Sequence, residues 1–147
     1  MSQIIKFDRW YEPAQENRCI HLYLPDGYDQ SEERYPVIYM FDGHNLFFDE
    51  DASFGKSWGL KTFLDQWPKK MIVVGMECSH TGNDRLKEYS PYRIYARMFG
   101  SITGIGDLTM QWIVNEVKPY IDSNYRTWSH REATAIGGSS MGGMMAL

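Results

Sequence analysis

The sequence of 147 residues has little cysteine and no long apolar run, and each shortage excludes a class of protein. Its two cysteines, Cys19 and Cys78, form neither a Cys-x-x-Cys pair nor a cluster with metal-ligand spacing, which argues against a disulfide framework or a zinc module. Apolar stretches such as 71–76 fall far below the ~18 residues of a membrane-spanning helix. Residues 1–8 lack the basic and apolar regions of a signal peptide. We therefore expect a cytoplasmic protein with reduced thiols.

Basic charge is also scarce. The chain has 15 Lys and Arg against 19 Asp and Glu, a net charge of −4, so it offers no basic surface for the phosphates of a nucleic acid. Apolar residues make up 43% and charged residues 23%, a balance typical of globular domains and not of disordered chains. No repeat, low-complexity tract or linker divides the sequence, and its length predicts one domain.

The apolar patterns predict a mixed β-sheet. Segments 4–7 and 18–24 alternate in part and are expected to pair as antiparallel strands. Segments 36–41 and 71–76 are apolar almost throughout, which is typical of parallel strands buried on both faces. Segment 134–138 is a third, shorter example. The fold class predicted from these patterns is α/β.

Helices are predicted between these strands. Segment 57–64 is one candidate, and a second begins at Asp107 as N-cap and carries an apolar stripe. Pro119 falls within that stripe and predicts a kink or an early end. Segment 78–106 has no clean period, so we expect a long loop at the carboxyl edge of the sheet, where α/β folds bind their ligands.

The pattern that carries chemistry is Gly138-x-Ser140-x-Gly142, which follows a buried-strand pattern and precedes helix-forming residues. This context predicts a nucleophile elbow, a tight strand-to-helix turn that exposes a serine. Bulky residues two positions either side of the serine would clash, and the two glycines remove that clash. Ser140 is thus the candidate nucleophile, whereas Ser139 is expected to pack or cap. The structural alternative is a glycine-rich turn without chemistry.

Segment 138–143 resembles the elbow of the putative-esterase branch of the α/β hydrolases, which includes esterase D, enterochelin esterase, feruloyl and acetylxylan esterases, and mycolyltransferases. Segments 35–43, 85–91 and 119–122 also fit, so the resemblance runs from about residue 17 to the end. It implies a three-layer α/β-hydrolase fold with a mostly parallel sheet and helices on both faces. It also implies a serine esterase that works through an acyl-enzyme.

The same resemblance implies an oxyanion hole formed by two backbone N–H groups. One belongs to Met141, directly after the serine, and the other to His44, which follows the Asp42-Gly43 turn. Two such donors stabilise the negative charge that develops on the carbonyl oxygen. Without the resemblance, His44 could equally be a polar loop residue. Its imidazole is not assigned as the catalytic base.

A serine of this type needs a histidine base and a carboxylate, which in α/β hydrolases follow the serine in the chain. Residues 141–147 contain neither Asp, Glu nor His. All four histidines precede the serine: His21, His44, His80 and His130. We therefore expect residues 1–147 to be a single, incomplete α/β-hydrolase domain, truncated after the elbow and inactive alone. Its open edge at segment 134–138 predicts self-association or pairing with a C-terminal fragment.

The expected function is hydrolysis of a small-molecule carboxylic ester. Aromatic residues make up 15% of the chain, and some could stack on the sugar of a carbohydrate acyl ester. Two alternatives stay open: an acyltransferase of the same fold, and a non-catalytic hydrolase-like fragment. No metal, cofactor, nucleic-acid or membrane partner is expected.

Overall fold

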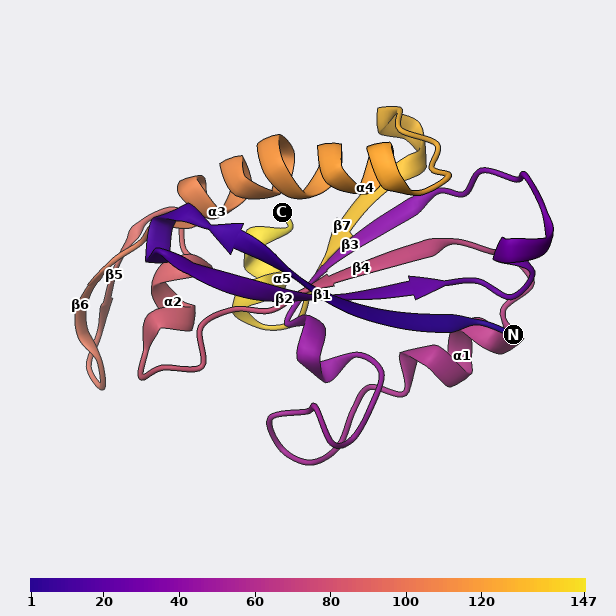
Figure 1. Cartoon of the computed structure of the whole chain (residues 1–147). Helices are drawn as coiled ribbons and strands as arrows, with labels where there is room; N and C mark the ends of the chain where they lie inside the picture. The colour runs from indigo at the N-terminus through magenta and orange to yellow at the C-terminus, as the bar shows by residue number, and fades with distance from the viewer.

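A computed structural model describes all residues, 1–147, and shows a five-stranded sheet in the order β1-β2-β4-β3-β7 (Figure 1). β1 and β2 form an antiparallel hairpin, β2 is also antiparallel to β4, and β4, β3 and β7 run parallel. The five strands are β1 (Gln3–Tyr11), β2 (Glu16–Leu24), β3 (Val37–Phe41), β4 (Ile72–Met76) and β7 (Thr134–Gly137). The predicted antiparallel pair and the predicted parallel strands are confirmed.

Helices cover both faces of this sheet, as the three-layer prediction requires (Figure 1). One apolar cluster joins Tyr39 of β3 to Val117 and Ile121 of the long helical segment, residues 106–124, and another joins Val73 of β4 to Leu64 of α1. No helix combines the length and apolar character that a membrane crossing demands. The α-helices are α1 (Leu60–Gln66), α2 (Asp84–Glu88), α3 (Gly106–Trp112), α4 (Lys118–Asn124) and α5 (Met141–Met145).

The long helical segment differs from its prediction in two respects. α3 begins at Gly106 with Ile105 at the N-cap, so Asp107 is not the cap but lies in the first turn, where its carboxylate still favours the helix dipole. Of the two outcomes predicted at Pro119, a kink or an early end, the early end is wrong. The helix passes through a π-helical segment, Ile113–Val117, and continues as α4. Proline donates no backbone hydrogen bond, and the wider turn directly before it accommodates that loss.

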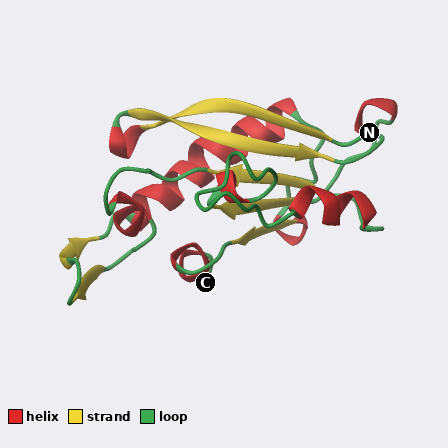
Figure 2. Ribbon diagram, turned by 90° about the horizontal axis from the view of Figure 1, so that it is seen from below, coloured by secondary structure: helices red, strands yellow, loops and turns green.

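Segment 78–106 is not the plain loop that its lack of period suggests. It contains α2 and a small antiparallel hairpin, β5 (Arg93–Ala96) and β6 (Gly100–Thr103), which projects away from the main sheet (Figure 2). A buried ion pair between Arg18 of β2 and Glu88 of α2 holds the segment against the sheet. The helix and the two strands have only four or five residues each, which is too short for a periodic apolar pattern to predict them.

β7 lies at the margin of the sheet and pairs only with β3 (Figure 2). Its register runs from Thr134 opposite Val37 to Gly137 opposite Met40. Its opposite side has no neighbouring strand among residues 1–147, as expected for segment 134–138.

Candidate active site

Ser140 occupies a sharp turn between β7 and α5. Its backbone has φ 55° and ψ −122°, and it is one of three non-glycine residues with positive φ. Such a conformation costs about 1–3 kcal/mol and persists only where the surroundings impose it. The expected strained strand-to-helix turn is confirmed, and it leaves the serine exposed.

The two elbow glycines are required by close backbone approaches. A Cβ atom at Gly138 would lie 2.5 Å from the carbonyl carbon of Gly142, and one at Gly142 would lie 2.8 Å from Cβ of Phe41. The prediction that Ser139 packs or caps is wrong. Its side chain is exposed and lines the same cavity as Ser140, because the turn presents both residues to solvent and only the Ser139 carbonyl is bonded, to the N–H of Gly142.

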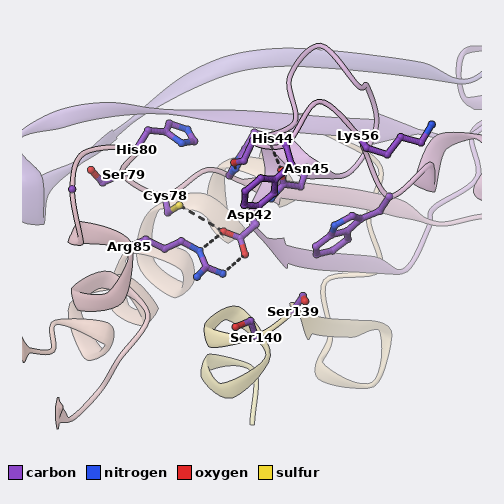
Figure 3. A pocket seen from close by; sticks show the side chains of 14 residues that line it. Asp42, His44, Asn45, Lys56, Cys78, Ser79, His80, Arg85, Ser139 and Ser140 are labelled. Atoms are coloured by element: carbon purple, nitrogen blue, oxygen red, sulfur yellow. Dashed lines mark hydrogen bonds and ion pairs between the residues drawn. The ribbon is translucent and has the colours of Figure 1, made fainter. Parts of the chain in front are cut away.

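This cavity has a volume of about 500 Å³ and opens at the carboxyl edge of the parallel strands (Figure 3). Three connections line it. The turn after β3 contributes Asp42 and His44, the segment after β4 contributes His80 and Arg85, and the elbow after β7 contributes Ser140. The structure therefore brings His44 and Ser140 to one cavity, and it places the first part of segment 78–106 at the carboxyl edge of the sheet, as expected.

Asp42 and Arg85 form an ion pair at the base of the cavity. Arg85 donates from Nε to Oδ1 of Asp42 at 2.8 Å and from Nη2 to Oδ2 at 2.7 Å (Figure 3). The hydrogen bonds to Asp42 raise the pKa of Arg85, so the guanidinium stays charged. Asp42 is buried with φ 58°, and its N–H donates to the hydroxyl of Tyr89 at 3.1 Å. The pair fixes the turn that carries His44.

Gly43 brings the same turn against the sheet. A Cβ atom there would lie 2.3 Å from the carbonyl carbon of Gly75 in β4, so only glycine allows this approach. His44 follows in a 3-10 turn, Gly43–Asn45, and Met141 is the first residue of α5. Because β3 and β7 are adjacent and parallel, the turns that hold His44 and Met141 lie at the same edge of the sheet.

None of the histidines is hydrogen-bonded to the Ser140 hydroxyl. His21 and His80 each contact the carboxylate of Glu77, and the Nε2 atom of His44 lies 2.9 Å from the hydroxyl of Ser53. His130 precedes β7 and so lies at the opposite edge of the sheet from the elbow. The sequence carries no signal that marks Glu77 and Arg85, because only the fold brings them to this edge.

Comparison with known proteins agrees with this architecture. A family profile described as "Putative esterase" matches residues 12–147. The uncharacterized protein YbbA of Bacillus subtilis is 26% identical over 133 residues, which cover 89% of this chain and 50% of that protein. Esterase Rv1288 of Mycobacterium tuberculosis is 28% identical over 131 residues, which cover 89% of this chain and 25% of that protein. The chain thus spans half or less of the length of these relatives.

Solved structures share the fold. An IroE-like serine hydrolase from Shewanella oneidensis superposes with a TM-score of 0.74 at 28% identity, over 98% of this chain and 45% of the other. A ferulic acid esterase superposes with a TM-score of 0.67 at 24% identity, over 99% of this chain and 53% of the other. With the profile matching almost the whole sequence, the chain belongs to the "Putative esterase" family, a branch of the α/β-hydrolase superfamily.

Proposed function

We propose that Ser140 is the nucleophile of a carboxylic-ester hydrolase and that this chain supplies the nucleophile and the oxyanion hole. The observation that carries the proposal is the backbone of Ser140, which combines φ 55° and ψ −122° with an exposed position in the cavity. A structural turn has no need to hold a serine in so strained a conformation at the ligand edge. The Shewanella relative, at 28% identity, is described as a serine hydrolase, which supports the same chemistry.

In the proposed reaction, Oγ of Ser140 forms a bond to the ester carbonyl carbon and passes its proton to a base. The carbonyl oxygen becomes an alkoxide, which the backbone N–H groups of His44 and Met141 stabilise, each by about 3 kcal/mol. Collapse of this intermediate breaks the bond to the leaving alcohol, which takes the proton from the base. Water then hydrolyses the acyl-enzyme through the same steps.

The base and its carboxylate are supplied from outside residues 1–147 in this proposal. The positions of the present histidines support it. His21 is buried and bonded to Glu77, the imidazole of His44 is buried beside Ser53, and His130 lies at the other end of β7. His80 lines the cavity, but its Nε2 atom is engaged by Glu77 at 3.0 Å, so none of the four is hydrogen-bonded to the Ser140 hydroxyl.

Among esters, the cavity favours those with a flat group beside the acyl bond, such as carbohydrate acyl esters. Phe54 and Trp58 line the cavity with 96% and 45% of their surfaces exposed, and Lys56 lies between them in sequence. Exposed aromatic rings of this kind offer a stacking surface, and the charged lysine offers a hydrogen-bond donor.

The test compares two serines of one cavity. Turnover of p-nitrophenyl acetate is measured for the chain extended by the residues that its coding sequence specifies after Leu147. Ser140→Ala should lower kcat by about 10⁶-fold, as loss of a nucleophile does. Ser139→Ala is the matched control and should stay within tenfold of the parent. Equal activity of the parent and Ser140→Ala would overturn the proposal.

The 147 residues alone are the second arm. They should show no turnover that depends on Ser140, because no base is available. If the unextended chain turned over at a rate typical of enzymes, about 10 per second, and Ser140→Ala abolished it, the base would lie within these residues.

A further inference from the structure

His44 and His80 line the cavity of Ser140, and their imidazoles, together with the carboxylate of Glu77, take no part in the proposed reaction. Glu77 directly follows β4, His80 comes three residues later, and His44 belongs to the turn after the neighbouring strand β3. One ligand atom from each of these three residues lies within 4.8 Å of the other two. Imidazole nitrogen and carboxylate oxygen are the donors found in three-residue zinc sites with one open position.

Glu77 is oriented by histidines on both of its oxygens. Oε1 lies 2.6 Å from Nε2 of His21, and Oε2 lies 3.0 Å from Nε2 of His80. The second distance is close to the ~3.3 Å that separates neighbouring ligands of a tetrahedral ion with bonds of about 2.0 Å. His21 contacts the oxygen that faces away from His80 and so orients the carboxylate from outside the proposed site, as a residue behind a metal ligand does.

His44 has hydrogen-bonding capacity that the protein does not use. The residue is only 5% exposed, and its Nδ1 atom is buried without a hydrogen-bond partner. Its Nε2 atom is bonded to the Ser53 hydroxyl, the kind of contact that orients a ligating ring from outside the metal site. Buried polar atoms without a partner are rare in proteins and ask for an explanation.

We propose that His44, Glu77 and His80 form a binding site for a divalent ion of the zinc class, with its open coordination position toward the cavity. Binding replaces the His80–Glu77 hydrogen bond with two bonds to the ion, and any proton on His80 passes to solvent. The side chain of His80 is 54% exposed and its ring contacts that of His44, so it can adjust to the ion without disturbing the core. Ca²⁺ and Mg²⁺ prefer oxygen ligands, which makes Zn²⁺, Co²⁺ or Ni²⁺ the matching ions.

The test is a titration with Co²⁺ of the metal-free protein, extended as in the esterase test by the residues that its coding sequence specifies after Leu147. Binding is followed by visible absorption, and Zn²⁺ is then used to displace the Co²⁺. One Co²⁺ per chain should bind with the bands of a four- or five-coordinate ion. His80→Ala and Glu77→Gln should each weaken binding at least tenfold. His130→Ala removes a histidine far from the site and should leave the affinity unchanged.

Two outcomes would overturn the proposal. One is the absence of stoichiometric Co²⁺ binding. The other is an equal loss of Co²⁺ affinity in His130→Ala and His80→Ala, which would mean that scattered surface histidines bind the ion. Because His80 is half exposed, its replacement spares the core, and circular dichroism of His80→Ala confirms that a loss of binding is local. Ser140→Ala should bind Co²⁺ as the parent does, so the metal site and the esterase proposal fail or hold separately.

Discussion

The elbow requires glycine at position 138 for steric reasons, and a single substitution tests this requirement. We expect Gly138→Ala to lower the free energy of unfolding by about 1–3 kcal/mol, the usual cost of overpacking, because the new Cβ would lie 2.5 Å from backbone that cannot move aside. Gly137→Ala is the control. Its Cβ meets only the flexible Met40 side chain, at 3.0 Å from Sδ. Urea unfolding of both variants measures the difference, and equal costs would contradict the steric account.

Glu77 gives a prediction on pH at the same scale. Its pKa is depressed to about 2 in the folded chain, below its ordinary value of 4.5, so it contributes stability above about pH 5 that is lost as pH falls toward 2. The contribution at pH 7 is about 3 kcal/mol at most. In metal-free buffer, the stability gap between the parent and Glu77→Gln should therefore close between pH 5 and pH 2. A gap that stays constant over this range would show that Glu77 is not held by its histidines.

At the scale of elements, the Arg18–Glu88 pair decides where segment 78–106 lies. Their side chains are 5% and 4% exposed, and Glu88 also accepts the N–H of Ser79 at 3.0 Å. Glu88→Ala leaves the buried guanidinium with only the half-exposed carboxylate of Glu16 as a partner, which should cost up to about 3–5 kcal/mol. Lys87→Ala removes only an exposed ion pair with Asp84 and should cost less than about 1 kcal/mol. Chemical unfolding measures the free energy of unfolding of both variants. A loss in Glu88→Ala as small as that in Lys87→Ala would show that the Arg18–Glu88 pair does not anchor the segment.

The sequence predicts those elements whose characteristic pattern of residues is continuous in the chain. β3 and β4 are predicted because each is an uninterrupted apolar run, which indicates a strand buried on both faces. The elbow is predicted because the Gly138-x-Ser140-x-Gly142 pattern contains all the residues that the turn requires. α2 and the β5–β6 hairpin are too short for a period, and Arg18 and Glu88 lie far apart in the chain. The group of His44, Glu77 and His80 comes from two segments that only the parallel pairing of β3 and β4 brings together. Metal-ligand spacing in the sequence could not reveal it.

For the whole molecule, the open side of β7 predicts association of the isolated chain. Unpaired backbone groups on an apolar edge invite a further strand, either from a second copy or from a C-terminal fragment. The 147-residue chain should therefore elute above its monomer size and unfold at low temperature. Ala135→Lys places a charge on an exposed position of the edge strand and should raise the monomer fraction. A monomer that unfolds cooperatively above about 60 °C would contradict this prediction.

The place of Ser140 at the end of this edge strand links folding to the rate of the proposed reaction. A nucleophile displaced by 1 Å can lose about 10²-fold in rate, because effective molarity depends on alignment. β7 is held by one neighbour, whereas β3 and β4 are each held by two. Whatever pairs with the free side of β7 would narrow the positional fluctuations of the serine. Such a segment would raise kcat through precision even without contributing a group to the chemistry.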